Sequence, residues 1–179
     1  MEIQSNSVLS DKNVVEFTTV AVEFSHFVEN ARSKSREDFV SLALKLLPLL
    51  YLKATLLPHY DTEEEFELEN CVTEDDYALI RHQVAAVMGS QDDYLDGFVQ
   101  DMKYSDKPIL RTISEDMADI YQDIRNFTEV FRQGFEETMR ESVAAVQQNF
   151  ELYWGQSLVN TMRALHDVYY NQHINEDEE

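Results

Sequence analysis

LKLLPLLYLKATLLP, residues 44–58, is the most apolar segment of this 179-residue chain, and it has a proline in its middle. Lys45 and Lys53 interrupt the segment, and its apolar run is shorter than the ~20 residues that a helix needs to cross a bilayer. We therefore interpret it as a bundle helix and not as a membrane span. The run of apolar residues predicts a central, mostly buried helix, with the wall of an apolar pocket as the alternative.

The proline of this segment divides two halves whose helical patterns do not match. At about 100° per residue, the apolar residues of 39–50 cover an arc of roughly 220°, and Pro48 falls in the polar remainder. A proline does least harm on such a solvent-facing side. After Pro48 the pattern slips, because Leu52 enters the polar sector and Lys53 the apolar one. A bend at Pro48 would rotate the second half and restore the match.

Charge and composition restrict the classes of partner. The chain has 35 acidic and 14 basic residues, a net charge of −21, and this field repels nucleic-acid phosphates and anionic lipids. We expect no nucleic-acid or membrane partner, and a basic protein as the favoured one; an acidic DNA mimic is a minor alternative. The single Cys71 excludes an intramolecular disulfide. With no visible secretory signal, these features predict a cytoplasmic protein.

Helix start and stop signals divide the rest of the chain. Apolar spacings of three and four predict a first helix over residues 11–31, and Ser35 with Asp38 forms a capping-box variant before the apolar segment. Thr73 and Asp76 cap a shorter helix that ends at Gly89. Further helical patterns cover residues 92–102, as a short amphipathic turn or two, and 113–131, with Ser114 as the cap. After Gly134 a last pattern runs to Tyr169, with a bend or break at Gly155.

These segments predict an all-α fold, a mostly antiparallel up-and-down bundle of five or six helices. Only four glycines and three prolines punctuate the chain, which favours long elements. We expect one domain over residues 1–179, with flexible tails at about 1–10 and 174–179 and an acidic loop at 59–73.

Several motifs imitate metal sites without completing one. Glu23 and His26 form a Glu-x-x-His pair, but a di-iron site needs a second pair and two more glutamates, so an exposed pair is expected. Residues 92–103 imitate a calcium loop, yet Tyr94 and Lys103 occupy two ligand positions. We expect at most weak cation binding by the acids of this segment, which are Asp92, Asp93 and Asp96. No metal or other cofactor is predicted.

Other candidate chemical groups also have structural explanations. His166 and Asp167 resemble part of a metal-dependent phosphohydrolase motif, but His166 is interpreted as a structural histidine at the edge of the core. Acids at helical spacing, Glu64 and Glu67 among them, resemble the pairs with which helical pyrophosphohydrolases hold magnesium. Three acids of the 113–131 helix are expected on its outer, solvated face: Asp116, Asp119 and Asp123. Cys71 lies among acids that raise a thiol pKa, which disfavours a catalytic thiolate.

Two segments are the candidate binding sites. Residues 61–76 contain nine acids and no Lys or Arg, and this segment is either a solvated loop or a docking surface for a basic protein. Its candidate docking residues are Glu63, Glu64, Glu65 and Glu67. The second is a loop between two helices that is rich in hydrogen-bonding groups, with Tyr104, Ser105 and Asp106 as candidate contacts for a partner or ligand.

Four long strings together are similar to a known family: FVSLALKLLPLLYLKATLLP (39–58), DDYLDGFVQDMKYSDKPIL (92–110), ISEDMADIYQDI (113–124) and NFELYWGQSLVNTMRALHDVYY (149–170). The chain resembles a bacterial family of domains of unknown function over nearly its whole length. The resemblance implies a helical cytoplasmic domain without an assigned activity, and it transfers no functional residue. We therefore expect a non-enzymatic interaction or adaptor domain, with a magnesium-dependent hydrolase of a phosphorylated small molecule as the alternative.

Overall fold

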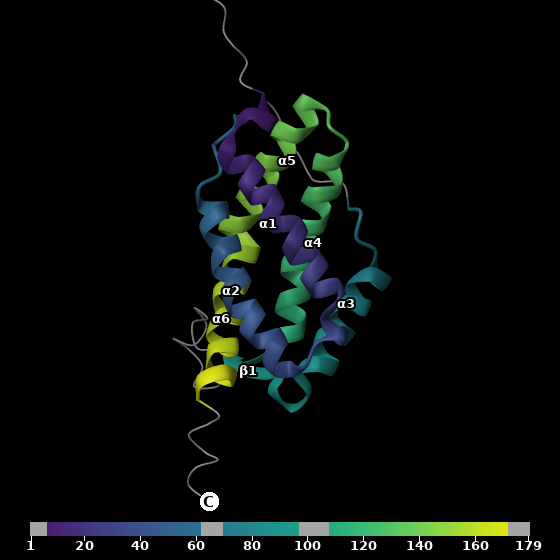
Figure 1. Cartoon of the computed structure of the whole chain (residues 1–179), viewed down its shortest axis with the longest axis vertical. Helices are drawn as coiled ribbons and strands as arrows, with labels where there is room; N and C mark the ends of the chain where they lie inside the picture. The colour runs from purple at the N-terminus through teal and green to yellow at the C-terminus, as the bar shows by residue number, and fades with distance from the viewer. Residues whose placement is uncertain (1–6, 62–69, 97–107, 172–179) are drawn as a thin grey trace, which may run out of the picture.

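The computed structural model describes residues 7–61, 70–96 and 108–171, and in these ranges the fold is an all-α bundle (Figure 1). Short 3-10 turns precede α1, follow it and follow α3. A two-stranded sheet lies between α3 and α4. The helices are α1 (Lys12–Glu29), α2 (Arg36–Thr55), α3 (Glu74–Met88), α4 (Ile113–Arg132), α5 (Glu136–Asn149) and α6 (Gly155–Tyr170), and the strands are β1 (Asp93–Asp96) and β2 (Ile109–Thr112).

Side-chain caps start the first three helices close to the predicted places. Asp11 accepts hydrogen bonds from the backbone N–H groups of the first turn of α1. Ser35 accepts from the N–H of Asp38 at the start of α2, and Thr73 forms a full capping box with Asp76 at the start of α3. Each cap satisfies N–H groups that have no partner within the helix.

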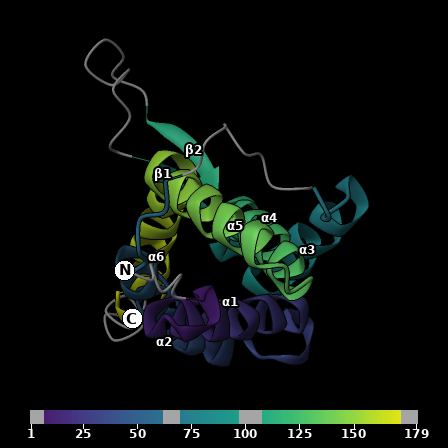
Figure 2. The ribbon, with the colours of Figure 1, turned by 90° about the horizontal axis from the view of Figure 1, so that it is seen from above.

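The central helix of the bundle is α4, not α2. The apolar residues predicted for the 113–131 helix are all buried, and α4 packs against α1, α3, α5 and α6. Seen from above, α1 and α2 form one layer, α3, α4 and α5 form another, and α6 closes one side (Figure 2). The prediction that the apolar 44–58 segment is the central, mostly buried helix is therefore wrong, because α2 lies at the edge.

The long C-terminal helical pattern is interrupted at the predicted place. Residues Phe150–Trp154 form a π-helical turn, and α6 begins directly afterwards at Gly155. A Cβ atom at Gly155 would lie 2.4 Å from the carbonyl oxygen of Phe150, so this close backbone approach requires a glycine. Trp154 is buried at 1% exposure, and its Nε1 donates to the carbonyl of Val146 at 3.0 Å.

Residues 93–96 form a strand and not the predicted amphipathic turn; the rest of that prediction, up to residue 102, lies outside the described residues. In the antiparallel pair β1–β2, Tyr94 lies opposite Arg111 and Asp96 opposite Ile109. Tyr94 and Asp96 point toward the bundle, where their side chains find polar partners in β2 and α4. These tertiary contacts decide the conformation of a segment whose local pattern favoured a helix.

The predicted cap of α4 is wrong by two residues. Thr112 is the N-cap, and its hydroxyl accepts from the N–H of Glu115 at 3.1 Å. Ser114 lies inside the first turn, where its N–H and hydroxyl both donate to the carboxylate of Asp92, at 2.8 and 2.6 Å. Asp92 therefore fixes the start of the sheet to the start of α4.

Candidate functional site

The outer face of α2 exposes a line of leucines to solvent. Leu42, Leu49, Leu52 and Leu56 have exposed fractions of 43%, 40%, 52% and 43%. We call these four residues the leucine stripe. Leu42, Leu49 and Leu56 are seven residues apart and so lie nearly in line along the helix. The apolar arc of α2 is wider than the face that the helix buries, and the surplus leucines lie on its outer side.

The pattern mismatch that a bend at Pro48 was predicted to remove is still present after Pro48. α2 continues through Pro48, Leu52 remains exposed, and Lys53 stays on the side of α1. There the ammonium of Lys53 pairs with the carboxylate of Glu16 at 2.6 Å, and this hydrogen bond lowers the pKa of Glu16. Lys53 can therefore lie on the packed side of α2 because its charge is paired with Glu16 of α1.

A groove of about 590 Å³ lies on the surface where α2 packs against α6. Pro48 lies in this groove and is half-buried, so its side of α2 is not the open solvent face that the sequence predicted. The pocket-wall alternative therefore describes this part of the 44–58 segment. The wall of α2 is Leu44, Pro48 and Tyr51, and the wall of α6 is Val159, Met162, Arg163, His166 and Tyr170.

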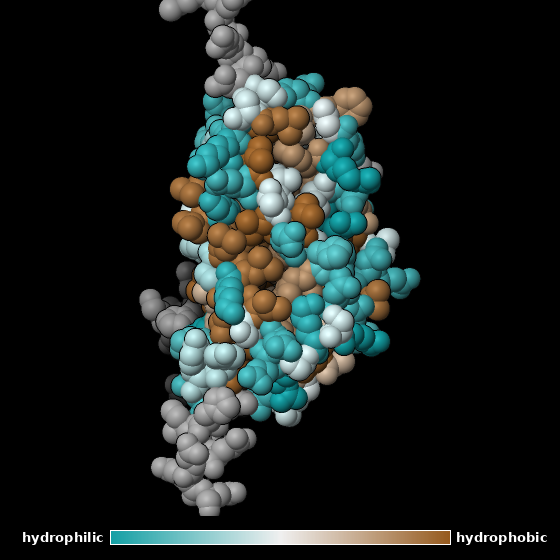
Figure 3. All heavy atoms as spheres, in the orientation of Figure 1, coloured by the Kyte–Doolittle hydropathy of each residue, from teal (hydrophilic) through white to brown (hydrophobic). Residues whose placement is uncertain are grey.

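A second groove, of about 610 Å³, lies on the other side of α2, against α1. Its apolar floor includes Phe27, Leu42, Leu46 and Leu49, and Glu23 and His26 stand on the wall of α1. Both of these α1 residues are exposed, which confirms their interpretation as an exposed pair. Figure 3 shows apolar residues gathered on the face that α1 and α2 form. The leucine stripe is thus a ridge between two grooves.

Three acids of α4 are buried or half-buried and not solvated on its outer face, which corrects the prediction for Asp116, Asp119 and Asp123. Asp116 has no exposed surface, and its carboxylate accepts from Arg111 at 2.5 Å, from the hydroxyl of Thr161 at 3.3 Å and from the hydroxyl of Tyr94. Burial raises the pKa of Asp116, against the opposing effect of the Tyr94 and Arg111 hydrogen bonds. This cluster joins β1, β2, α4 and α6.

The two following acids of α4 have one hydrogen-bond partner each among the described contacts. Asp119 accepts from the hydroxyl of Tyr77 at 2.8 Å, and Asp123 accepts from the side-chain amide of Asn149 at 2.8 Å. Burial raises the pKa of both carboxyl groups, and for Asp123 it reaches about 6. The negative charge of Asp119 adds to the shift of Asp123. These acids connect α4 to α3 and α5.

The described carboxylates do not converge on a metal site. Within residues 7–61, 70–96 and 108–171, no group of three or more His, Cys, Asp or Glu side chains is placed to hold a metal ion. Of the three acids considered for weak cation binding, Asp92 is bonded to Ser114 and Asp96 pairs with Arg111 at 3.7 Å. These carboxylates give no support to the magnesium-dependent hydrolase alternative.

Comparison with known families and structures agrees with the helical architecture. Residues 8–171 match the family described as "Domain of unknown function (DUF5063)". The chain belongs to the DUF5063 family. The search of curated proteins found no match. Protein BF1032 from Bacteroides fragilis, a structural-genomics target with a crystal structure, is 49% identical, with a TM-score of 0.79 over 91% of this chain and 96% of that one.

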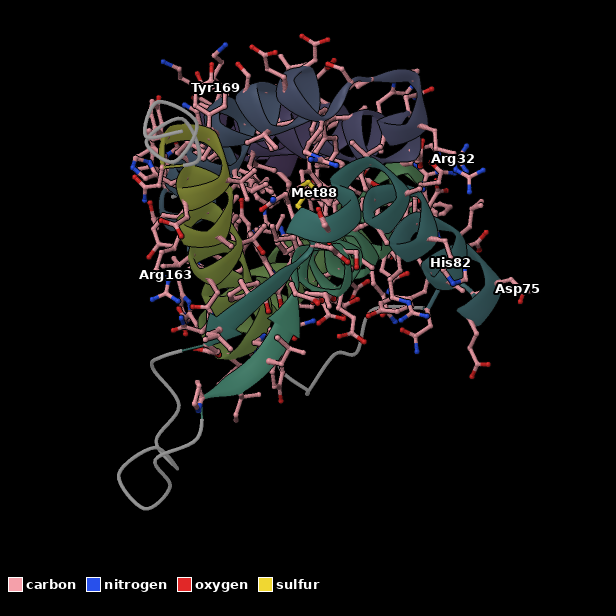
Figure 4. All side chains as sticks on the ribbon, turned by 90° about the horizontal axis from the view of Figure 1, so that it is seen from below. Arg32, Asp75, His82, Met88, Arg163 and Tyr169 are labelled. Atoms are coloured by element: carbon pink, nitrogen blue, oxygen red, sulfur yellow. The ribbon has the colours of Figure 1, made fainter. Side chains whose placement is uncertain are left out.

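His166 of this DUF5063 chain lies elsewhere than predicted. His166 is exposed, lines the groove between α2 and α6 and has its ring 4.6 Å from that of Tyr170, so it is not a core histidine. Arg163, one turn earlier, points outward from α6 (Figure 4) and donates to the carbonyl of Leu95 at 2.7 Å. The arginine therefore connects the groove to the sheet.

The candidate residues of the two predicted binding segments lie outside the described residues. Glu63, Glu64, Glu65 and Glu67 fall in 62–69, and Tyr104, Ser105 and Asp106 fall in 97–107. The described end of the first segment is Asn70–Asp76. There the buried Asn126 of α4 accepts from the backbone N–H groups of Cys71 and Val72, at 2.9 and 3.0 Å.

Sequence reasoning missed the leucine stripe and the buried polar contacts of α4. A signal for the stripe was present, because an arc of roughly 220° exceeds what one packed face of a helix buries. The seven-residue spacing of Leu42, Leu49 and Leu56 was a second signal. Asn126 and Arg111 gave no such signal, since their partners are distant in sequence or on the backbone.

Proposed function

We propose that this DUF5063 chain is a non-enzymatic protein-interaction module with an acidic surface. The observation that supports the proposal is the leucine stripe of α2, an apolar ridge between two grooves on a chain with a net charge of −21. Monomeric soluble proteins rarely expose large contiguous apolar patches, and patches of this kind mark interaction surfaces.

The engagement of the described acids also favours an interaction module over an enzyme. Asp92, Asp116, Asp119 and Asp123 each accept hydrogen bonds from protein groups that hold elements of the bundle together. Carboxylates used in this way contribute to packing specificity, and the described ones do not converge to hold a metal ion.

The proposed acidic docking surface is the segment that contains Glu63, Glu64, Glu65 and Glu67, and its proposed partner is a basic protein. A segment with nine acids and no basic residue attracts such a partner over a distance of about one Debye length, ~8 Å at physiological salt. Tyr104, Ser105 and Asp106, in the segment between the two strands, are proposed as additional contacts.

The test is a pull-down from native lysate with the tagged full-length chain, quantified by mass spectrometry. The variants are Leu49→Lys, in the leucine stripe, and a quadruple Glu→Gln variant of Glu63, Glu64, Glu65 and Glu67. Leu79→Lys, at an exposed leucine of α3, is the matched control. We expect specific partners of the wild type that are retained by the control and lost from at least one of the two variants.

Salt separates the two surfaces in this experiment. Partners that depend on the acidic segment should dissociate as the salt concentration rises, whereas partners of the apolar stripe should not. An interactome that is identical for the wild type and both variants would contradict the proposed function. So would a marked loss of thermal stability in the quadruple variant, because it would show that these carboxylates make structural contacts.

A further inference from the structure

The charge of this chain is distributed unevenly, and the segment that carries the leucine stripe is close to neutral. Residues 12–58, which contain α1 and α2, have six basic and five acidic residues. The rest of the chain has 8 basic and 30 acidic residues. Almost the whole net charge of −21 therefore lies outside the α1–α2 hairpin.

This distribution selects among the occupants that the face could take. A strongly basic partner gains little from a neutral face and would bind the acidic remainder of the chain instead. A second strongly acidic chain is repelled by that remainder unless the two acidic parts point away from each other. Contact through α1 and α2 brings together the segments of the two copies that carry almost no net charge, so repulsion directly at the interface is small.

The leucine stripe has the symmetry that contact between two copies requires. Leu42 and Leu56 lie seven residues before and after Leu49, about 10.5 Å along the helix in each direction. If a two-fold axis passes beside Leu49 and the two α2 helices run antiparallel, Leu42 of one copy meets Leu56 of the other and Leu49 meets itself. An isologous interface needs this kind of self-complementary surface.

The grooves beside α2 give the ridge of the other copy a place to pack. Leu42, Leu46 and Leu49 border the groove against α1, so the same residues form part of the ridge and part of a groove. α2 spans about 30 Å and a helix is about 10 Å wide, a footprint of roughly 300 Å². A stable interface buries about 800 Å² per partner. To approach that area, the interface must also cover the groove walls on α1 and α6.

We propose that the face formed by the leucine stripe and its flanking grooves is a two-fold interface between two copies of this chain. The inference deepens the proposed function, in which α2 is a docking surface, by naming the partner as a second copy. Lys45, also exposed on this face, is accommodated because its aliphatic stem can lie along the leucines of the other copy while the ammonium reaches solvent.

Sedimentation velocity of the full-length chain from ~1 to ~300 µM tests this inference. We expect the mass to rise with concentration toward twice the 20.9 kDa of one chain. Leu49→Lys should weaken the association by on the order of 100-fold, because two like charges then face each other at the axis. This variant also lowers the net negative charge, so general repulsion cannot explain the loss. The control Leu79→Lys should dimerise like the wild type.

A charge exchange at the axis makes the test specific for the proposed symmetry. Leu49→Glu alone should be monomeric, and an equimolar mixture of Leu49→Lys and Leu49→Glu should dimerise again, since residue 49 faces itself only across this axis. Circular dichroism melts verify that each variant is folded. If a Leu49 variant is not, a mixture of Leu56→Lys and Leu42→Glu replaces the pair, because residues 56 and 42 meet across the same axis. Dimers that persist in the Lys variant, or a mixture that stays monomeric, would overturn the inference.

Failure of this inference can be distinguished from failure of the proposed function. A wild-type chain that is monomeric at every concentration overturns the two-fold interface. If Leu49→Lys nevertheless loses partners in the pull-down, α2 is a docking surface for a different protein and the proposed function stands. If the chain is a dimer and the pull-down shows no difference between variants, the interface is supported while the interaction with other proteins is not.

Discussion

Asp123→Asn should stabilise this protein at neutral pH. Asp123 lies partly buried on α4, where burial and the charge of Asp119 raise its pKa from 3.8 to about 6. The variant removes the negative charge but keeps an oxygen that can accept the hydrogen bond from Asn149, which is 2.8 Å long in the wild type. The change therefore isolates the cost of ionising a carboxyl group at this position.

The magnitude and sign of the effect follow from proton linkage. Between pH 4 and pH 6 the folded chain holds a proton on Asp123 that the unfolded chain has released, so the free energy of unfolding falls as the pH rises. A shift from 3.8 to about 6 corresponds to roughly 3 kcal/mol at full ionisation. At pH 7.5 the variant should be more stable by up to that amount, and near pH 4 the two proteins should be equally stable.

Urea unfolding followed by circular dichroism at several pH values measures this difference. For a chain of this size, about 3 kcal/mol corresponds to a rise of roughly 6–12 °C in Tm at pH 7.5. Glu151→Gln removes one charge from an exposed position and should change stability by less than ~0.5 kcal/mol. The reasoning is refuted if the wild type and Asp123→Asn show the same dependence of stability on pH, or if the variant is less stable at pH 7.5.

Three further substitutions or measurements test the packing. Gly155→Ala should destabilise the chain by about 1–3 kcal/mol in urea unfolding, because its Cβ would meet the Phe150 carbonyl; an unchanged midpoint would contradict the close approach. Asn126→Ala should cost at least ~2 kcal/mol, since two backbone N–H groups lose their acceptor, while Asn126→Asp should recover most of it. The fluorescence of Trp154 should be blue-shifted and inaccessible to iodide, and emission near that of free indole would contradict its burial.

The starts of α2 and α3 were parts of the fold that could be predicted from sequence. Ser35 and Thr73 each act within three residues of chain, so a local pattern is sufficient to place the helix start. The strand β1 could not be placed in this way. Tyr94 and Asp96 are held by Asp116 and Arg111, which are 15 or more residues away in sequence, and no local pattern reports such contacts.

The exchange of roles between α2 and α4 shows what hydrophobicity alone does and does not specify. α4 has acids at helical spacing, yet it is the central helix because Tyr77, Tyr94, Arg111 and Asn149 reach those acids from four other elements. Their hydrogen bonds offset part of the cost of burying the carboxylates. α2 is more apolar but lies at the edge, because its leucines exceed what one packed face can bury. The exposed leucines of α2 do not contribute to the core, and a contact with another protein chain explains them better. In this protein they lie on α2, the helix with a groove on each side, and that is where the two-fold interface is proposed.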